Sequence, residues 1–372
     1  MTYSKIWCLI LSLFALASSC GNRQSQSDNF LVDSSEVVEG KLSDLVKINR
    51  VVPLETNDSS VMQSISSIKK RNGRYYIISK YRPYVFDGDG KFLFMPSRVG
   101  QGPGEYSQQV NCMDADNEHI YLYAPPKLIT LNLNGEFVKE TVVDWGWGGE
   151  FRKIPQGFLT VTENMPDSTH IGFYDNDLNP IVKDARFSGY MDLNFNGVWA
   201  RYDEGKYIQN GGRSTDFYLF DSDKQSFSKI RFSARKDGLT AEEHYELAWK
   251  QKKSDAEIPN FMVSSPQSFG DNCIWYCKES PDSWPMYYKP GNSKNVRILK
   301  PTTDDITFLE PADKFLAYPS LTNSDENQII TILNMDDIDT GSDPYINRMG
   351  IYYQLGAISP EPNPIIIEFE IL

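Results

Sequence analysis

Short apolar segments recur along the chain, each made of two or three apolar or aromatic residues that end at a polar residue and a turn. Six segments share this pattern: Val85–Asp87, Thr130–Asn132, Phe173–Asp175, Leu219–Asp221, Tyr287–Lys289 and Ile332–Asn334. The intervals between their last residues are 45, 43, 46, 68 and 45. A second short apolar segment precedes each of them, as Tyr75–Ile78 precedes the first. Short apolar runs separated by Gly, Asp, Asn and Pro favour β-strands joined by tight turns.

The complete repeat contains four expected strands. A weaker strand begins each repeat, at Ile65–Lys69, Val110–Met113, Phe151–Ile154, Val198–Arg201, Gln267–Phe269 and Ile306–Leu309. A fourth follows the turn, most clearly at Lys91–Phe94, Glu136–Val138 and Lys229–Phe232. Repeats of this length that are built from short strands are typical of β-propellers, with one blade for each repeat. The sequence therefore predicts an all-β, six-bladed β-propeller.

The ends of the chain and the long interval add two expectations. Ring closure needs strands from both ends, and Ile365–Leu372 can pair with Phe30–Val32 or Val51–Leu54. The 68-residue interval holds an insertion with a capping box at Thr240–Glu243, followed by apolar residues at helical spacing. We expect a short helical insertion at about 238–258, between blades 4 and 5.

The N-terminus resembles a bacterial lipoprotein signal. Lys5 precedes the twelve-residue apolar run Ile6–Ala17, which is too short to span a bilayer and has the length of a signal core. Small residues lead directly to Cys20, and this resemblance implies cleavage before Cys20 and acylation of that residue; an ordinary secretory signal is the alternative. We expect a signal peptide over 1–19, a tether with an N-terminal strand over 20–41, and the propeller over 42–372.

The net charge and the cysteine content limit the kinds of partner and bond that we expect for this protein. Removal of residues 1–19 takes away Lys5 alone among charged residues, which leaves 36 basic against 50 acidic residues and a formal charge of −14. Such a charge repels phosphate backbones and anionic lipid, so we expect no nucleic acid partner and membrane contact through the Cys20 anchor alone. The remaining cysteines are Cys112, Cys273 and Cys277, interpreted as buried apolar residues because no disulfide or zinc spacing is present.

Further along, several motifs resemble one family. They are Val52–Thr56, Ile65–Ile68, Phe86–Leu93, Gly100–Tyr106 and Asn363–Ile367. Together they resemble the six-bladed β-propeller lipoproteins of Bacteroidota, which are distant relatives of NHL-repeat propellers and are largely uncharacterised. The resemblance implies the fold and a cell-envelope location, and it carries over no catalytic residue. No acidic cluster follows Cys20, which favours an outer-membrane anchor facing the periplasm over surface exposure.

Strand alternation places the loops between blades and those between second and third strands on one face. Exposed tryptophan and arginine dominate recognition surfaces because they bury large areas or form forked hydrogen bonds. The candidate ligand-binding residues on this face are Arg82, Arg98, Glu105, Trp145, Trp147, Glu150, Arg213 and Trp284. Packing between blades is the alternative role for each of them.

The remaining motifs do not predict a phosphate-binding or metal-binding site. Gly100–Gly104 lacks the spacing and the helix of a phosphate-binding loop and is interpreted as a turn between blades. Asp87–Asp89, Asp175–Asn179 and Asp221–Asp223 resemble fragments of calcium loops but lack the distal glutamate, so we expect structural turns. The three histidines, His119, His170 and His244, lie in different repeats without metal-ligand spacing.

Two hypotheses for the function follow. The first is a lipid-anchored binding or scaffold module for a glycan, a peptide or an envelope protein, with no cofactor. The second is a propeller enzyme, either a carboxylate-dependent lyase or hydrolase or a calcium-dependent lactonase, since paired carboxylates at the channel remain open. The sequence favours the first and identifies no catalytic residue.

Overall fold

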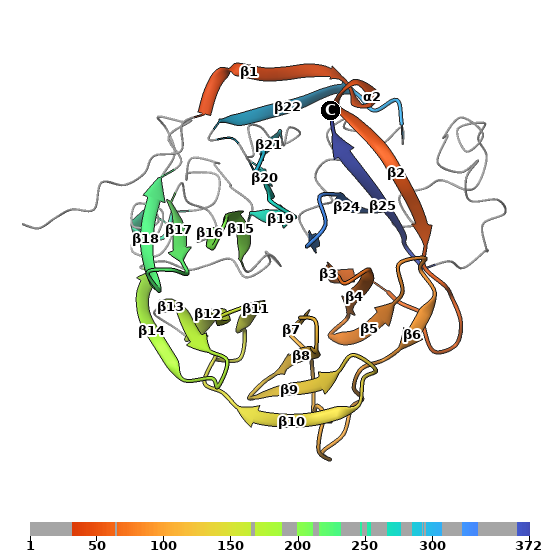
Figure 1. Ribbon diagram of the computed structural model, residues 1–372, viewed down its shortest axis with the longest axis vertical. Helices are drawn as coiled ribbons and strands as arrows, with labels where there is room; N and C mark the ends of the chain where they lie inside the picture. Colours follow the sequence, from red (N-terminus) through yellow and green to blue (C-terminus); the bar gives the residue numbers. More distant parts are fainter. Residues whose placement is uncertain are drawn as a thin grey trace, which may run out of the picture.

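The computed structural model is an all-β protein whose strands are arranged radially around a centre (Figure 1). It describes residues 32–63, 65–164, 168–187, 199–210, 216–231, 246–247, 251–253, 266–276, 285–291, 293, 295–306, 322–333 and 363–372. The predicted signal peptide, Cys20, Cys277 and most of the predicted helical insertion lie outside these residues. Within the described residues, no helix is long and apolar enough to cross a membrane.

The strands form antiparallel groups in which each strand pairs with the next along the chain. The first group contains β3 (Ile65–Arg71), β4 (Arg74–Ser79), β5 (Arg82–Phe86) and β6 (Phe92–Phe94). The second contains β7 (Cys112–Ala115), β8 (His119–Ala124), β9 (Lys127–Asn132) and β10 (Phe137–Val142). The third contains β11 (Glu150–Ile154), β12 (Gly157–Asn164), β13 (Ser168–Asp175) and β14 (Pro180–Phe187). In each of them the first strand lies nearest the centre of the ring (Figure 1).

The later groups repeat this order. β15 (Ala200–Asp203), β16 (Lys206–Asn210), β17 (Asp216–Asp221) and β18 (Ser226–Arg231) form one sheet. β19 (Gln267–Phe269), β20 (Asn272–Tyr276), β21 (Met286–Lys289) and β22 (Val296–Thr303) form the next group. Its inner strand is joined to β3 through β23 (Thr322–Ser324), which pairs in parallel with both β19 and β3. The inner strands therefore run in the same direction where they meet around the centre, which is a propeller-like arrangement.

Both ends of the chain contribute outer strands. β24 (Ile329–Leu333) pairs with β25 (Ile365–Ile371), and β25 pairs with β2 (Val46–Pro53) from the N-terminal part. β1 (Val32–Lys41) runs in parallel along the outer edge of β22, and the four-residue helix α2 (Leu42–Leu45) turns the chain from β1 into β2. The predicted pairing of the C-terminal strand with an N-terminal strand is confirmed at Val51–Pro53.

Two strand predictions in the last repeat were wrong. Residues 304–306 lie outside any strand and 307–309 lie outside the described residues, and the inner position predicted for Ile306–Leu309 is occupied by β23. Ile332 and Leu333 belong to β24, which pairs with β25, whereas the corresponding segments in the earlier repeats belong to third strands. A buried run such as Ile329–Leu333 carries no alternation that would show which strand position it occupies.

The core lies between neighbouring groups rather than at the centre. Large side chains such as Phe86, Phe173 and Trp275 are fully buried between sheets. Cys112 and Cys273 are buried free thiols, which confirms the interpretation for these two cysteines. The centre itself is lined mainly by charged and polar side chains.

Candidate functional site

The centre of the ring holds a buried charged cluster, which we call the axial cluster: Lys69 and Arg71 of β3, Asp114 of β7 and Arg152 of β11. Arg71 Nε lies 3.1 Å from Asp114 Oδ1, and Lys69 Nζ lies 3.7 Å from Asp114 Oδ2. Each of the three cationic residues is less than 10% exposed, and Asp114 is fully buried. The carboxylate of one strand group therefore pairs with two cations of the neighbouring group.

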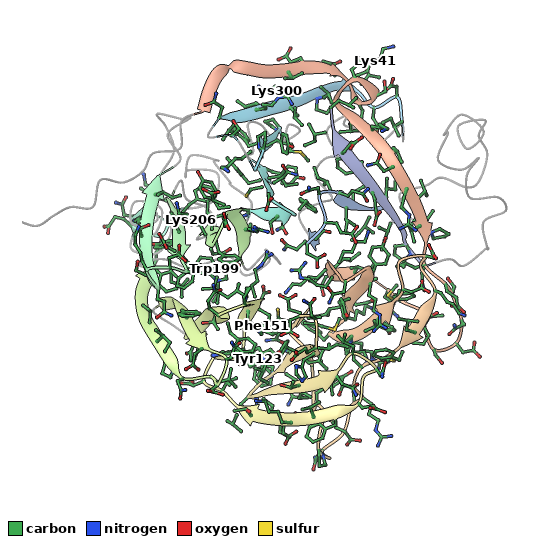
Figure 2. All side chains as sticks on the ribbon, viewed as in Figure 1. Lys41, Tyr123, Phe151, Trp199, Lys206 and Lys300 are labelled. Carbon is green, nitrogen blue, oxygen red and sulfur yellow. The ribbon has the colours of Figure 1, made fainter. Side chains whose placement is uncertain are left out.

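Arg152 links the axial cluster to the opposite side of the ring. Its Nη1 donates to the carbonyl of Trp199, 2.7 Å away, and to the hydroxyl of Ser268 in β19, 2.8 Å away. That hydroxyl donates to Asn323 Oδ1 of β23 at 3.2 Å, and the Asn323 amide donates to Gln267. Figure 2 labels Trp199 and Phe151, the neighbours of this linkage, close to the centre. A chain of hydrogen bonds thus runs from β11 through β19 to β23.

The environment shifts the pKa of several groups here. Burial opposes ionisation of Asp114, but Arg71 and Lys69 outweigh it and hold the pKa of this carboxyl below its ordinary value. Burial, with a contribution from nearby Arg71, lowers the pKa of Arg152 to about 10. Burial also raises the pKa of Glu150 to about 7, and Lys69 opposes that rise. The cluster consequently holds more positive than negative charge.

A second buried ion pair lies on the other side of β3. Lys70 Nζ is 2.6 Å from Glu368 Oε1 of β25 and 2.5 Å from Glu326 Oε2. The hydroxyl of Tyr75 donates to the same Glu368 oxygen, and burial, together with this carboxylate, raises the Tyr75 pKa above its ordinary range. These contacts tie the first strand group to the closing strands, and they leave Lys70 no free charge to offer a ligand.

The predicted candidates from the first two groups lie on the face where chain segments enter the inner strands, which we call the loop face. Arg82 is exposed there. Arg98 is also exposed, and its Nε lies 2.6 Å from Glu105 Oε1. The other Glu105 oxygen accepts from the backbone of Gly102, and a Cβ at Gly100 would lie 2.0 Å from it. Glu105 therefore holds the glycine loop in a turn, as the turn interpretation predicted.

Trp145 and Trp147 differ sharply. Trp145 is fully buried, and its ring packs against Tyr123, Phe151 and Tyr174 at centroid distances of 5.3, 5.6 and 5.6 Å. The expectation that Trp145 is exposed for recognition was wrong, because the turn to Gly149 directs it into the core. Trp147 is 57% exposed. Arg213 and Trp284 lie outside the described residues.

Sequence reasoning missed a neighbour of Trp147. Tyr81 is 56% exposed, and its carbonyl accepts from the backbone of Val110 at 3.0 Å. The next residue, Asn111, donates its side-chain amide to the carbonyl of Trp147. Tyr81 and Trp147 thus lie on either side of Val110–Asn111, and we call these two residues the aromatic pair. The loop Lys80–Pro83 contains both Tyr81 and Arg82, but the sequence analysis selected Arg82 alone as a candidate.

The opposite face, formed by the turns that end the inner strands, carries a pocket of about 620 Å³. Its lining is polar: Arg201, Asp203, Glu204, Asp271, Asn272, Gly291 and Asn327. Arg201 Nη1 lies 3.0 Å from Asp271 Oδ1, which fixes one wall. This turn-face pocket was not predicted from the sequence, because its residues come from four separate turns and the strand ends beside them.

The acidic turns are structural. Asp87 Oδ1 accepts from the backbone of Asp89 and Lys91, and Asp175 Oδ1 accepts from Asp177 and Asn179 in the same way. Asp221 repeats the arrangement with Asp223 and Lys224. Across the described part of the chain, no group of three or more His, Cys, Asp or Glu side chains is placed to hold a metal ion.

The chain matches one protein family over most of its length. Residues 30–370 match the family described as "Domain of unknown function (DUF4934)". The chain belongs to this DUF4934 family. None of the curated proteins matches the chain.

One solved structure shares the fold of this DUF4934 protein. A protein from Bacteroides fragilis NCTC 9343, described as a "Putative exported protein", superposes with a TM-score of 0.62 at 14% identity, over 91% of this chain and 99% of that chain. A protein of unknown function from Bacteroides caccae matches at a TM-score of 0.39 and 10% identity, over 64% of this chain and 82% of that one. At these identities the first match shows a shared fold and nothing about function, and the second carries no argument.

Proposed function

We propose that this DUF4934 protein is a six-bladed β-propeller of the cell envelope, anchored by lipid at Cys20, which binds a glycan, a peptide or a partner protein on its loop face. Six inner strands support the blade count: β3, β7, β11, β15, β19 and β23. The lipoprotein-like sequence up to Cys20 and the description of the Bacteroides fragilis neighbour as exported support the location.

The observation that carries the binding proposal is the aromatic pair. Tyrosine and tryptophan offer large, rigid contact areas with a polar end, and they lose little conformational entropy when they bind. The backbone carbonyls of Tyr81 and Trp147 accept hydrogen bonds from Val110 and Asn111, which anchors the backbone at both positions. Arg82 is exposed beside Tyr81 and adds a planar hydrogen-bond donor for carboxylate or hydroxyl groups.

The buried ion pairs around the centre favour this face over a catalytic channel. Asp114 is engaged by Arg71, Lys69 and two backbone groups, and Glu368 by Lys70 and Tyr75. Asp114 and one oxygen of Glu368 thus already take part in ion pairs between strand groups, which weighs against a catalytic role for them. Recognition at the rim, rather than reaction at the axis, therefore fits the described residues best.

The binding test compares substitutions on the two faces. The full chain in detergent is screened by thermal shift against envelope glycans and peptides, and the affinity of any hit is then measured for Tyr81→Ala and Trp147→Ala. We expect each variant to lose at least tenfold in affinity with an unchanged melting temperature, since both side chains are exposed. Asp271→Asn in the turn-face pocket is the matched control and should bind normally. Loss of binding in the control, with normal binding in the aromatic variants, would place the site on the opposite face.

The anchor is tested separately. Metabolic labelling with a fatty acid should mark the wild-type chain, and Cys20→Ser should abolish both the label and the membrane fractionation. Cys8→Ser, which changes a cysteine inside the expected signal peptide, should keep both. A labelled, membrane-bound Cys20→Ser chain would contradict the anchor.

A further inference from the structure

The axial cluster has more buried positive charge than its own carboxylate can balance. Lys69, Arg71 and Arg152 are each less than 10% exposed, and Asp114 is the one carboxylate within ion-pair distance of any of them in the described ranges. Both carboxylate oxygens of Asp114 already have partners. Its Oδ1 accepts from Arg71 and the backbone of Ala115, and its Oδ2 faces Lys69 and accepts from the backbone of Lys153.

An unpartnered donor in the same cluster points to a missing acceptor. Arg71 Nε faces Asp114 and Arg71 Nη1 donates to the carbonyl of Lys70, but Arg71 Nη2 is buried without an acceptor among the described residues. A buried donor of a charged group without a partner carries a large desolvation penalty, which a bound acceptor removes. The direction of that acceptor is defined, because the guanidinium is planar and its other two nitrogens are fixed.

Arg152 supplies a second buried guanidinium, from the third strand group, and its Nη1 donates to Trp199 and Ser268. The charge of Arg71 adds to the burial that lowers the pKa of Arg152, so the two groups repel each other. Glu150 lies near enough to interact with Lys69 but makes no ion pair with any of the three cations. Two like-charged guanidinium groups in a buried site are stabilised when an anion lies between them.

We propose that the axial cluster is a binding site for a small monovalent anion, either a halide ion or a carboxylate group, held by Arg71 and Arg152 with Lys69 beside it. The anion accepts from Arg71 Nη2 and balances the excess positive charge. All three cations are buried, so a small anion suits the site better than a bulky one. Because β3 and β11 belong to different strand groups, the bound anion also joins them across the centre.

The first measurement uses crystals of the full wild-type chain grown or soaked in bromide. Anomalous diffraction should show a bromide peak within hydrogen-bond distance of Arg71 Nη2. Crystals soaked in formate instead should show planar density at the same position if the site prefers carboxylates. Crystals without a peak or planar density there, in either soak, would overturn the proposal.

Solution measurements test the same site. The melting temperature of the wild-type chain should rise by several degrees in chloride, bromide or formate compared with a bulky sulfonate at equal ionic strength. Arg71→Gln should abolish this dependence on the anion. Arg74→Gln is the matched control, because Arg74 donates to the carbonyl of Leu133 away from the axis, and it should keep the dependence.

The remaining outcomes are also decisive. If Arg71→Gln does not fold, Arg152→Gln replaces it, with a tenfold or greater loss of anion affinity expected. A response to halide alone or to formate alone identifies which anion the site takes. An equal response of wild type and both axial variants would show that the effect of salt is general and would overturn the proposal. None of these results depends on the ligand of the loop face.

Discussion

Asp114 offers the sharpest test of how the centre of the ring is stabilised. Replacement of this residue by asparagine keeps the shape of the side chain and one acceptor oxygen, but it removes the charge that Arg71 and Lys69 face at 3.1 and 3.7 Å. Removal of one partner from a buried ion pair typically costs about 3–5 kcal/mol, because the other charge remains buried and unpaired. We therefore expect Asp114→Asn to lower the free energy of unfolding by about 3–5 kcal/mol.

The assay is urea unfolding followed by tryptophan fluorescence at neutral pH, with Asp89→Asn as control. Asp89 pairs with Arg50 at 2.9 Å, but its side chain is 90% exposed, so the control should change stability by less than about 0.5 kcal/mol. A loss below about 1 kcal/mol for Asp114→Asn would refute the reasoning, since it would mean that the cations of the cluster do not depend on this carboxylate. The double variant Asp114→Asn with Arg71→Met should recover part of the loss, because it removes an uncompensated charge.

Three further predictions concern other parts of the ring. Glu150→Gln should leave the free energy of unfolding unchanged near pH 4.5 but raise it above pH 7, by about 1–2 kcal/mol after allowance for partial exposure. The folded state raises the pKa of Glu150 to about 7, so ionisation of this residue in the wild type costs stability as the pH rises. Urea unfolding at pH 5 and pH 8 checks this. Trp145→Ala should destabilise the protein by about 3–5 kcal/mol, whereas Trp147→Ala should change stability by less than about 0.5 kcal/mol, as measured by thermal and urea unfolding. Gly90→Ala should destabilise the protein by more than about 1 kcal/mol, because Gly90 has a φ of +82° and a Cβ there would lie 2.3 Å from the carbonyl oxygen of Pro53. An unchanged midpoint of urea unfolding would contradict the close packing of β2 against this turn.

Much of the strand order was predictable from local pattern. Tyr75–Ile78 and Val85–Phe86 are short aromatic and β-branched runs bounded by turn residues, and they form β4 and β5 as expected. Asp87, Asp175 and Asp221 fix their turns with their own side chains, so the sequence there determines the geometry locally. The prediction for the last repeat was wrong for the opposite reason. The position of β23 depends on pairing with β19 and β3, and that of β24 on pairing with β25, and these distant pairings leave no local pattern.

The candidate site was less predictable because burial depends on the assembled ring. Trp145 and Trp147 stand two residues apart in the same glycine-rich segment, and only the fold decides that one enters the core and the other reaches the surface. Lys69, Lys70 and Arg71 are three consecutive charges that normally indicate a solvated strand end. Their burial follows from the position of β3 at the centre, where strands from other groups supply the opposing charges.

The closing pair of strands has a consequence for the order in which the protein can fold. β2 and β25 pair between residues that are more than 300 positions apart, for instance Lys47 with Glu370. Contacts this distant in sequence slow folding, because the intervening chain must be ordered before they form. While the chain is being synthesised, β2 lacks its partner until β25 has been made, so the edge of β2 stays unpaired for that whole period. A chaperone that protects nascent β-strands would therefore act on this protein for longest at its first-made strands.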